Sequence, residues 1–311
     1  MRGMNKVVIV TMKTRLWKLI ERYNTFEQAK FYISHLGMNF DEYVEEDRQY
    51  NQSLDTVRTI CGNMARITEV DKTYLPNMIF GRDDVVVAVG QDGLVCNILK
   101  YLDKQDLIGV NPDVKRYDGK LLPFEPGDLE KILPKTLEKN AFRKNVTLGC
   151  VTTNDGQNLL AVNDFFIGCR THVSARYAIE YGNKREVQSS SGIIVSTGLG
   201  AGGWYASVMA GVCGIYKGMD GNDASLNQKV RKWDDNYLTF LVREPFPSKV
   251  TGTDICFGQI DDKQQLCISS QMAENGVIFS DGMEEDAITF NAGCYATVGI
   301  SDKKGYLVAH G

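Results

Sequence analysis

Short apolar runs alternate with longer segments of helical periodicity in the first third of the chain. The apolar runs are Val7–Val10, Val85–Val89 and 107–111 (LIGVN). Continuous runs rich in β-branched residues are typical of strands that are covered on both faces. Between the first two runs, residues 13–50 mix polar and apolar side chains in a mostly helical pattern. This alternation predicts an α/β domain in which helices cover a parallel sheet.

The pattern changes after about residue 120. Residues 121–140 contain three prolines and one helical stretch, and strand-like segments separated by glycine, asparagine and aspartate turns follow. These segments are 145–153, 158–168, 176–182, 191–197, 238–242, 254–260, 265–270, 276–281 and 287–292. Strands at such short spacing are typical of a mainly β domain. We therefore expect an N-terminal parallel-sheet α/β domain over 1–125 and a C-terminal mainly β domain from residue 126.

An aspartate lies between two glycines where the apolar run 85–89 ends and an amphipathic helical pattern begins. Gly90 and Gly93 flank Asp92 in this strand-to-helix turn, and glycine lets another molecule approach the backbone closely. A helix N-terminus also favours anions, so the turn fits either a phosphate site or a simple helix cap by Asp92. Ligands of parallel sheets bind beyond the carboxyl ends of strands, where we expect Asp92 and Asn111 to face one crevice.

Two stretches of the β domain depart from a regular strand pattern. Asn163 and Asp164 interrupt the apolar run 158–168, which fits either a bulge or turn, or a group that grips a ligand. A strand then leads into a glycine-rich loop over 192–203 and a helix of small residues that begins near Trp204. Glycine there permits close approach to a ligand, but flexibility or tight helix packing explains it equally well. The spacing matches neither the Rossmann fingerprint nor the P-loop.

Composition and charge argue against several classes of protein. The chain has 43% hydrophobic residues, enough for a sizeable core, and a net charge of −4 without a basic stripe, so nucleic acid is not an expected partner. The apolar runs fall short of the ~20 residues that span a bilayer, so we expect no membrane contact and a cytoplasmic location. The eight cysteines form no C-x-x-C pair and the three histidines are scattered, so no metal site is expected in the protein itself.

Four motifs, taken in order, resemble the NAD kinases. They are GQDG after the strand at 85–89, IGVN at 108–111, AVND at 161–164 and GIIVSTGLGAGGW at 192–204. The similarity is closest to the mitochondrial-type branch, through KTR at 13–15, GVNPDVKRYDG at 109–119, NDFFIG at 163–168, REP at 243–245 and SDG at 280–282. The resemblance implies an α/β domain, a β-rich NAD-binding domain over 126–285, and a segment over 286–311 that returns to the first domain.

The resemblance also implies the reaction and the residues that perform it. A phosphoryl group would pass from ATP, with Mg²⁺, to the adenosine 2′-hydroxyl of NAD, giving NADP, in an enzyme that forms a homodimer. Asp92 would be the catalytic base, and Gly90, Gln91 and Gly93 would bind phosphate. The residues expected to bind NAD are Asn111, Asn163, Asp164, Thr197, Gly203, Trp204 and Ser207. An aromatic side chain at Trp204 suits packing against a base.

The motifs depart from the family pattern at two positions of the first turn. Gln91 stands where the family has its second glycine, and Leu94 stands in place of a threonine. Three functions therefore remain open: an active NAD kinase, a related kinase acting on a sugar or lipid hydroxyl, and a non-catalytic NAD(P)-binding regulator with a degraded ATP site. The retained Asp92 and the ordered motifs favour the first.

Overall fold

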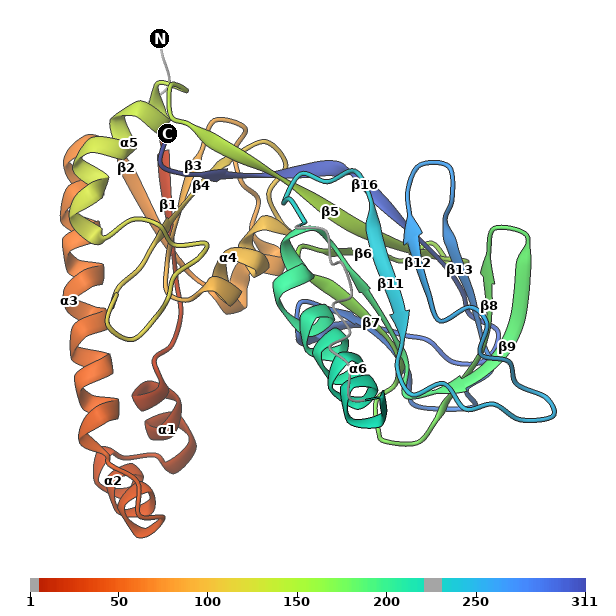
Figure 1. The fold of residues 1–311 in the computed structure, drawn as a ribbon. Helices are drawn as coiled ribbons and strands as arrows, with labels where there is room; N and C mark the ends of the chain where they lie inside the picture. The colour runs from red at the N-terminus through yellow and green to blue at the C-terminus, as the bar shows by residue number, and fades with distance from the viewer. Residues whose placement is uncertain (1–5, 221–230) are drawn as a thin grey trace. The chain divides into compact units, whose positions relative to one another are not determined.

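The protein is described by a computed structural model that covers residues 6–220 and 231–311 of the 311-residue chain. These residues form two compact units (Figure 1). Unit 1 consists of the chain up to Lys144 together with Tyr306–Gly311, and unit 2 consists of Asn145–Gly305. The first unit is built on a parallel sheet with helices and the second is mostly β, which confirms the predicted fold class. No helix of the described ranges is long and apolar enough to cross a membrane.

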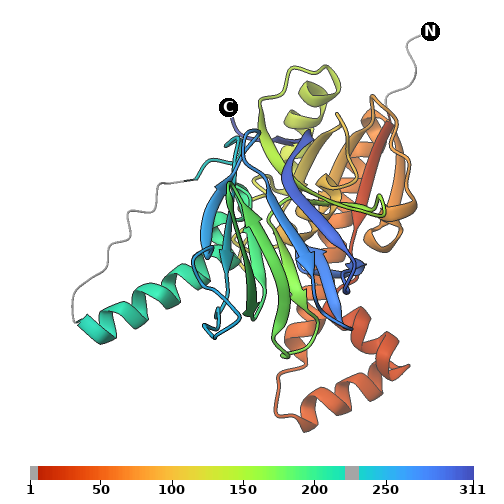
Figure 2. The same cartoon turned by 90° about the vertical axis from the view of Figure 1, so that its right-hand side faces the viewer.

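Unit 1 has a parallel sheet in the order β2-β1-β3-β4, to which the end of β16 adds beside β4. Its elements are β1 (Lys6–Thr11), α1 (Arg15–Tyr23), α2 (Phe26–His35), α3 (Asp41–Met64), β2 (Arg66–Asp71), η1 (Lys72–Asn77), β3 (Val85–Val89), α4 (Asp92–Leu99), β4 (Asp106–Val110), η2 (Pro126–Asp128) and α5 (Leu129–Leu137). The helices α1 and α2 pack together beside α3 around a small core of their own (Figure 2). The three predicted strands are therefore β1, β3 and β4.

Both faces of this sheet are covered, which explains its continuous apolar strands. Every residue of β3 is fully buried. Side chains of alternate positions, such as Val85 and Val87, pack with α3 and α5, and α4 lies on the other side of the strands (Figure 1). The connection that follows β1 therefore includes α3 on one face of the sheet, and the connection that follows β3 is α4 on the other face. This change of side marks the carboxyl ends of β1 and β3 as the switch point, where open α/β sheets bind ligands.

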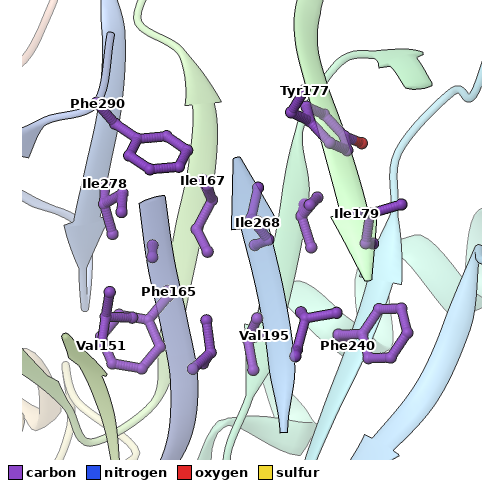
Figure 3. Close-up of a cluster of buried hydrophobic side chains, with 14 of the residues drawn as sticks. Val151, Phe165, Ile167, Tyr177, Ile179, Val195, Phe240, Ile268, Ile278 and Phe290 are labelled. Atoms are coloured by element: carbon purple, nitrogen blue, oxygen red, sulfur yellow. The ribbon is translucent and has the colours of Figure 1, made fainter. Parts of the chain in front are cut away.

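Unit 2 is a sandwich of two sheets. One sheet has the order β12-β11-β10-β7-β14-β15, and the other contains β5, β6, β8, β9, β13 and β16. The bounds are β5 (Arg143–Thr153), β6 (Asn158–Ala161), β7 (Asp164–Cys169), β8 (Ala175–Tyr181), β9 (Lys184–Ser190), β10 (Ile193–Ser196), η3 (Leu199–Gly202), α6 (Trp204–Asp220), β11 (Leu238–Val242), β12 (Phe257–Ile260), β13 (Leu266–Ser270), β14 (Gly276–Ser280), β15 (Met283–Thr289) and β16 (Tyr295–Val308). The core between the sheets includes Phe165, Phe240 and Phe290 (Figure 3). Helix α6 covers the opposite face of the six-stranded sheet through Tyr205, against Ile194.

Three strands were not predicted. They are β2, the edge strand of unit 1, and β9 and β16 of unit 2. Each carries charged residues at several positions, as in KREVQSS of β9 and the SDKK stretch of β16. They pair because a neighbouring strand offers its backbone groups, which a search for apolar runs cannot detect.

The two units divide later in the chain than the predicted boundary after residue 125. Helix α5 places Leu129 and Leu133 in the core of unit 1, so the segment up to Lys144 stays with that unit. At the other end, only Tyr306–Gly311 belongs to unit 1, whereas a return of the whole segment 286–311 was expected. The reason is that β15 and most of β16 pair with strands of unit 2.

Candidate functional site

The first candidate turn follows β3 in unit 1. Gly90 is buried, and a Cβ at this position would lie 2.7 Å from Met12 Sδ and 2.9 Å from Leu94 Cδ2. Gly93 is exposed, and a Cβ there would meet no atom within 4 Å. The two glycines therefore differ in role: Gly90 allows the turn to pack against β1, while Gly93 leaves the backbone open to an approaching molecule.

Asp92 does not cap the helix with its side chain. Gln91 occupies the cap position, and Asp92 lies in the first turn of α4. The Asp92 carboxylate instead accepts a hydrogen bond through Oδ1 from the backbone N–H of Leu121, at 2.9 Å. Within the described ranges, no group accepts a hydrogen bond from the backbone N–H of Asp92 or Gly93. These N–H groups and the helix dipole make the turn suited to an anion.

The two residues that depart from the family pattern differ in their burial. The Leu94 side chain is 3% exposed and packs beside Gly90, so it lies away from the open side of the turn. Gln91 is half-buried and lies near Tyr117. Burial raises the pKa of Tyr117, against a smaller lowering by the side chain of Gln91.

Asn111 ends the neighbouring strand, and its amide is engaged in the loop that follows. Its Nδ2 donates to the carbonyl oxygen of Tyr117 at 2.9 Å, and its Oδ1 accepts from the N–H of Asp113 at 3.0 Å. The residue is 4% exposed. Asn111 thus shapes the loop that also contacts Asp92 through Leu121. The structure links the two predicted residues through this loop, and it gives Asn111 a structural role beside its predicted contact with NAD.

A pocket of about 680 Å³ opens beside this loop in unit 1. One wall is the side of α3 that carries Arg48, and the other is formed by residues 111–116. Charges of both signs line it, because Arg48 pairs with Glu45 at 2.6 Å and Arg116 pairs with Asp113 at 3.4 Å. The pocket is therefore polar without a net excess of one charge.

The second candidate turn joins β6 to β7 in unit 2 and carries Asn163 and Asp164. The Asp281 carboxylate accepts hydrogen bonds from the backbone N–H groups of Val162 and Asn163, at 3.0 and 2.6 Å. The Thr197 hydroxyl donates to the carbonyl oxygen of Val162 at 2.6 Å. The interruption of the apolar run is thus a turn, and the half-buried Asp281 and the buried Thr197 fix its backbone.

Asp164 is 8% exposed and lies in the field of Asp281. Burial, with a further contribution from the negative charge of Asp281, raises the pKa of Asp164 to about 7. A carboxyl group with such a pKa can donate or accept a proton near neutral pH. Perturbed groups of this kind cluster at functional sites, which supports a role in ligand binding.

The remaining predicted residues surround the start of α6. The Trp204 ring stacks on Phe166, with centroids 5.6 Å apart, and the Arg243 guanidinium lies 5.5 Å from the Trp204 ring centroid. Gly203 donates its N–H to Gly200, and the Ser207 hydroxyl donates to the Gly203 carbonyl at 3.3 Å. Thr197 is brought together with the Asn163 turn, whereas Trp204 is engaged in aromatic packing on the sheet.

Asp281 and Tyr117 are contact residues that the sequence analysis did not single out. Asp281 and Gly282 both have a positive φ, of 55° and 70°, and an Asp-Gly pair between apolar segments is a recognised hairpin signal. That signal marks a turn but not its hydrogen bonds to residues 162–164. No local pattern indicates Tyr117, because its hydrogen-bond partner Glu46 is remote in sequence.

Comparison with known proteins establishes the fold. No family model matches the sequence, and no curated protein matches it. Among solved structures, a NAD kinase from Archaeoglobus fulgidus in complex with ATP matches with a TM-score of 0.56 and 16% identity, over 98% of this chain and 94% of that chain. Yeast NADH kinase complexed with NADH matches with a TM-score of 0.61 and 13% identity, over 100% and 85%. The chain therefore has the fold of the NAD and NADH kinases.

Proposed function

We propose that this protein is a NAD kinase, which transfers a phosphoryl group from ATP to the adenosine 2′-hydroxyl of NAD and forms NADP. The observation that carries the proposal is the place of Asp92 in this fold. It follows a buried parallel strand, in the first turn of a helix, at the carboxyl end of the switch-point strand β3. Ligands of open α/β sheets bind at this edge.

The chemistry of phosphoryl transfer suits this turn. The reaction depends mainly on positioning and charge neutralisation, with one group that accepts the proton of the attacking hydroxyl. The Leu121 N–H holds one oxygen of Asp92 and so orients the carboxylate. The first-turn N–H groups would receive phosphate oxygens. In unit 2, Asn163 and Asp164 would hold the ribose hydroxyls of NAD.

The burial of Leu94 supports an active kinase over a regulator without an ATP site. Leu94 is buried against Gly90, so it does not block Gly93. Mg²⁺ would be carried mainly by the triphosphate, as is usual for this ion.

The proposal is tested by incubating the purified protein with ATP, Mg²⁺ and either NAD or NADH, and by measuring the 2′-phosphorylated product. Asp92→Asn keeps the size of the side chain and removes the base, so we expect activity to fall by about 10²–10⁴-fold. Asp83→Asn, in the exposed loop before β3, serves as the matched control and is expected to stay active. Equal activity of Asp92→Asn and wild type would exclude Asp92 as the base.

The same samples separate the alternatives. Binding of NAD without turnover would favour the regulator, and phosphorylation of a sugar or lipid in place of NAD would favour the related kinase. We further propose the mitochondrial-type branch, a cytoplasmic location and a homodimer. Light scattering on the purified chain tests the last of these, because a homodimer doubles the measured mass.

A further inference from the structure

Tyr50 makes contacts in unit 1 that the proposed reaction does not use. It lies on α3 and is 8% exposed. Its hydroxyl accepts a hydrogen bond from the backbone N–H of Met12 at 3.0 Å and donates to the carbonyl oxygen of Val89 at 3.2 Å. Met12 directly follows β1, and Val89 is the last residue of β3 before the turn that carries Asp92. One hydroxyl thus joins helix α3 to the ends of two neighbouring strands.

The pairing between β1 and β3 ends just before these contacts. The two strands are in register up to Val10, which lies opposite Ala88. The N–H of Gly90 donates to the carbonyl oxygen of Val110 in β4 at 3.4 Å. Because the backbone groups of successive strand residues point to alternate neighbouring strands, those of Val89 face β1.

The Tyr50 hydroxyl occupies the place of the next backbone hydrogen bond of the sheet. In this register, the next bond would join the carbonyl oxygen of Val89 directly to the N–H of Met12. The hydroxyl instead bridges these two groups through two hydrogen bonds. A direct bond would need an N···O distance of about 2.9 Å, whereas an inserted hydroxyl holds the two groups farther apart. The strands therefore separate at this point, with both backbone groups satisfied.

The Tyr50 side chain has a defined position and a defined charge. Its ring packs in the core of unit 1 with Leu54 and Val57 of the same helix. Burial raises the pKa of Tyr50 to about 12, so the hydroxyl keeps its proton near neutral pH. It therefore remains a donor to Val89 and an acceptor from Met12 under the conditions in which the protein would work.

The turn after β3 is packed directly against Met12. A Cβ on Gly90 would lie 2.7 Å from Met12 Sδ. A pocket of about 350 Å³ opens beside the same strand ends and is lined in part by Met12 and Tyr50. A movement of Met12 toward Val89 would therefore displace the turn and reshape this opening.

We propose that Tyr50 is a positioning residue whose hydroxyl keeps the backbone of the Asp92 turn apart from the backbone after β1. The inference rests on the proposed binding of ATP at this turn. Without the hydroxyl, the Val89 carbonyl and the Met12 N–H would lose their partner, and they would regain a hydrogen bond by closing on each other. That closure would push Met12 against Gly90 and move the residues that follow. Tyr50 thereby sets the position of the first-turn N–H groups and of the Asp92 carboxylate.

The test compares Tyr50→Phe with wild type on the full chain. Phenylalanine keeps the ring and removes only the hydroxyl, so the core stays filled. The Kd of ATP is measured without NAD, the Kd of NAD is measured without ATP, and kcat is measured with both substrates at saturation. We expect the Kd of ATP to rise about fivefold and kcat to fall about tenfold, because the turn is misplaced, while the Kd of NAD changes less than about twofold.

The difference between the two substrates separates positioning from simple support of the fold. A variant with a smaller folded fraction would lose ATP and NAD binding alike, and that result would contradict the proposal. So would unchanged ATP binding. Tyr43→Phe is the matched control, because it removes a hydroxyl from a half-buried tyrosine of the same helix, and all three constants should stay within about twofold of wild type.

A crystal structure of Tyr50→Phe gives a direct readout of the separation. We expect the N–H of Met12 to donate to the carbonyl oxygen of Val89, with the pairing of β1 and β3 extended by one residue on each strand. Strand ends that stay apart in the variant would show that the hydroxyl does not hold them, and the proposal would be wrong.

The outcome is separable from that of the proposed function. If wild type forms no NADP but Tyr50→Phe closes the strands and weakens ATP binding alone, the kinase assignment fails and the inference holds. If NADP forms but Tyr50→Phe binds ATP like wild type, the inference fails and the kinase assignment holds. Absence of ATP binding to wild type would overturn both.

Discussion

The two turns that carry the predicted site residues are stabilised in opposite ways. The turn of unit 1, around Asp92, is held from outside by the loop 111–124, and its Gly93 is left open. The turn of unit 2, around Asp164, is held from inside by Asp281 and Thr197. We call the turn around Asp92 the open turn and the turn around Asp164 the closed turn. The open turn has room for a reacting group, whereas the closed turn has a fixed backbone.

The aspartates of the two turns, Asp92 and Asp164, also differ in their surroundings. Asp92 is half-buried, and its Oδ1 accepts a hydrogen bond from the backbone N–H of Leu121. Asp164 is buried near the Asp281 carboxylate, which makes its charged form unfavourable. Both aspartates lie at the end of an apolar segment, yet their surroundings differ. The environment of each carboxyl group is therefore set by its neighbours in the tertiary structure and not by its position in the sequence.

A large loss of stability at every pH is expected from a substitution at Gly200, which lies in η3 and packs against the closed turn. A Cβ at this position would overlap the carbonyl oxygen and carbon of Asn163, which are backbone atoms with little freedom to move. Gly200→Ala should therefore lower the free energy of unfolding by about 3 kcal/mol, measured by urea denaturation. Gly202→Ala, in the same loop with no atom within 4 Å, is the control. Equal stability of the two variants would show that the second turn is not closed.

An effect that depends on pH is expected from Asp164→Asn. The pKa of Asp164 is about 7 in the folded protein, against an ordinary value of about 3.9 in the unfolded chain. The folded state therefore binds the proton more tightly, and wild-type stability falls as pH rises from about 4 to 7.

The neutral variant lacks this loss, so its stability relative to wild type should rise by about 4 kcal/mol between pH 4 and pH 8. Thermal or urea unfolding across this pH range provides the measurement. Asp262→Asn, at an exposed position between β12 and β13, is the control and should run parallel to wild type. A pH-independent difference for Asp164→Asn would contradict a raised pKa.

The smallest effect on stability is expected at Gly93, in the open turn. A methyl group there meets no atom, and the position does not require a positive φ, so Gly93→Ala should change stability by less than about 0.5 kcal/mol. The methyl group would lie on the face proposed for phosphate, so the Kd of ATP should rise by roughly fivefold. A large loss of stability would remove the contrast between the two turns.

Local sequence patterns predicted the elements that carry both turns. The buried strand β3 and helix α4 follow from an apolar run and a helical period, and the polar pair at 163–164 marks the second turn. The search for apolar runs did not detect β2, β9 and β16, because these strands contain several charged residues. The predicted boundary also placed α5 in the β-rich domain, since amphipathicity shows that a face is buried but not against which core.

The sequence by itself determined the parallel-sheet unit, the β-rich unit, and the positions of Asp92 and Asp164 at the ends of apolar segments. Only the tertiary structure decided what those positions can do. Leu121 reaches Asp92 from a distant loop, and Asp281 reaches the Asp164 turn across 117 residues of chain. The physical reason is that periodicity reports which side chains leave water, whereas hydrogen-bond partners and electrostatic fields depend on residues that only folding brings together.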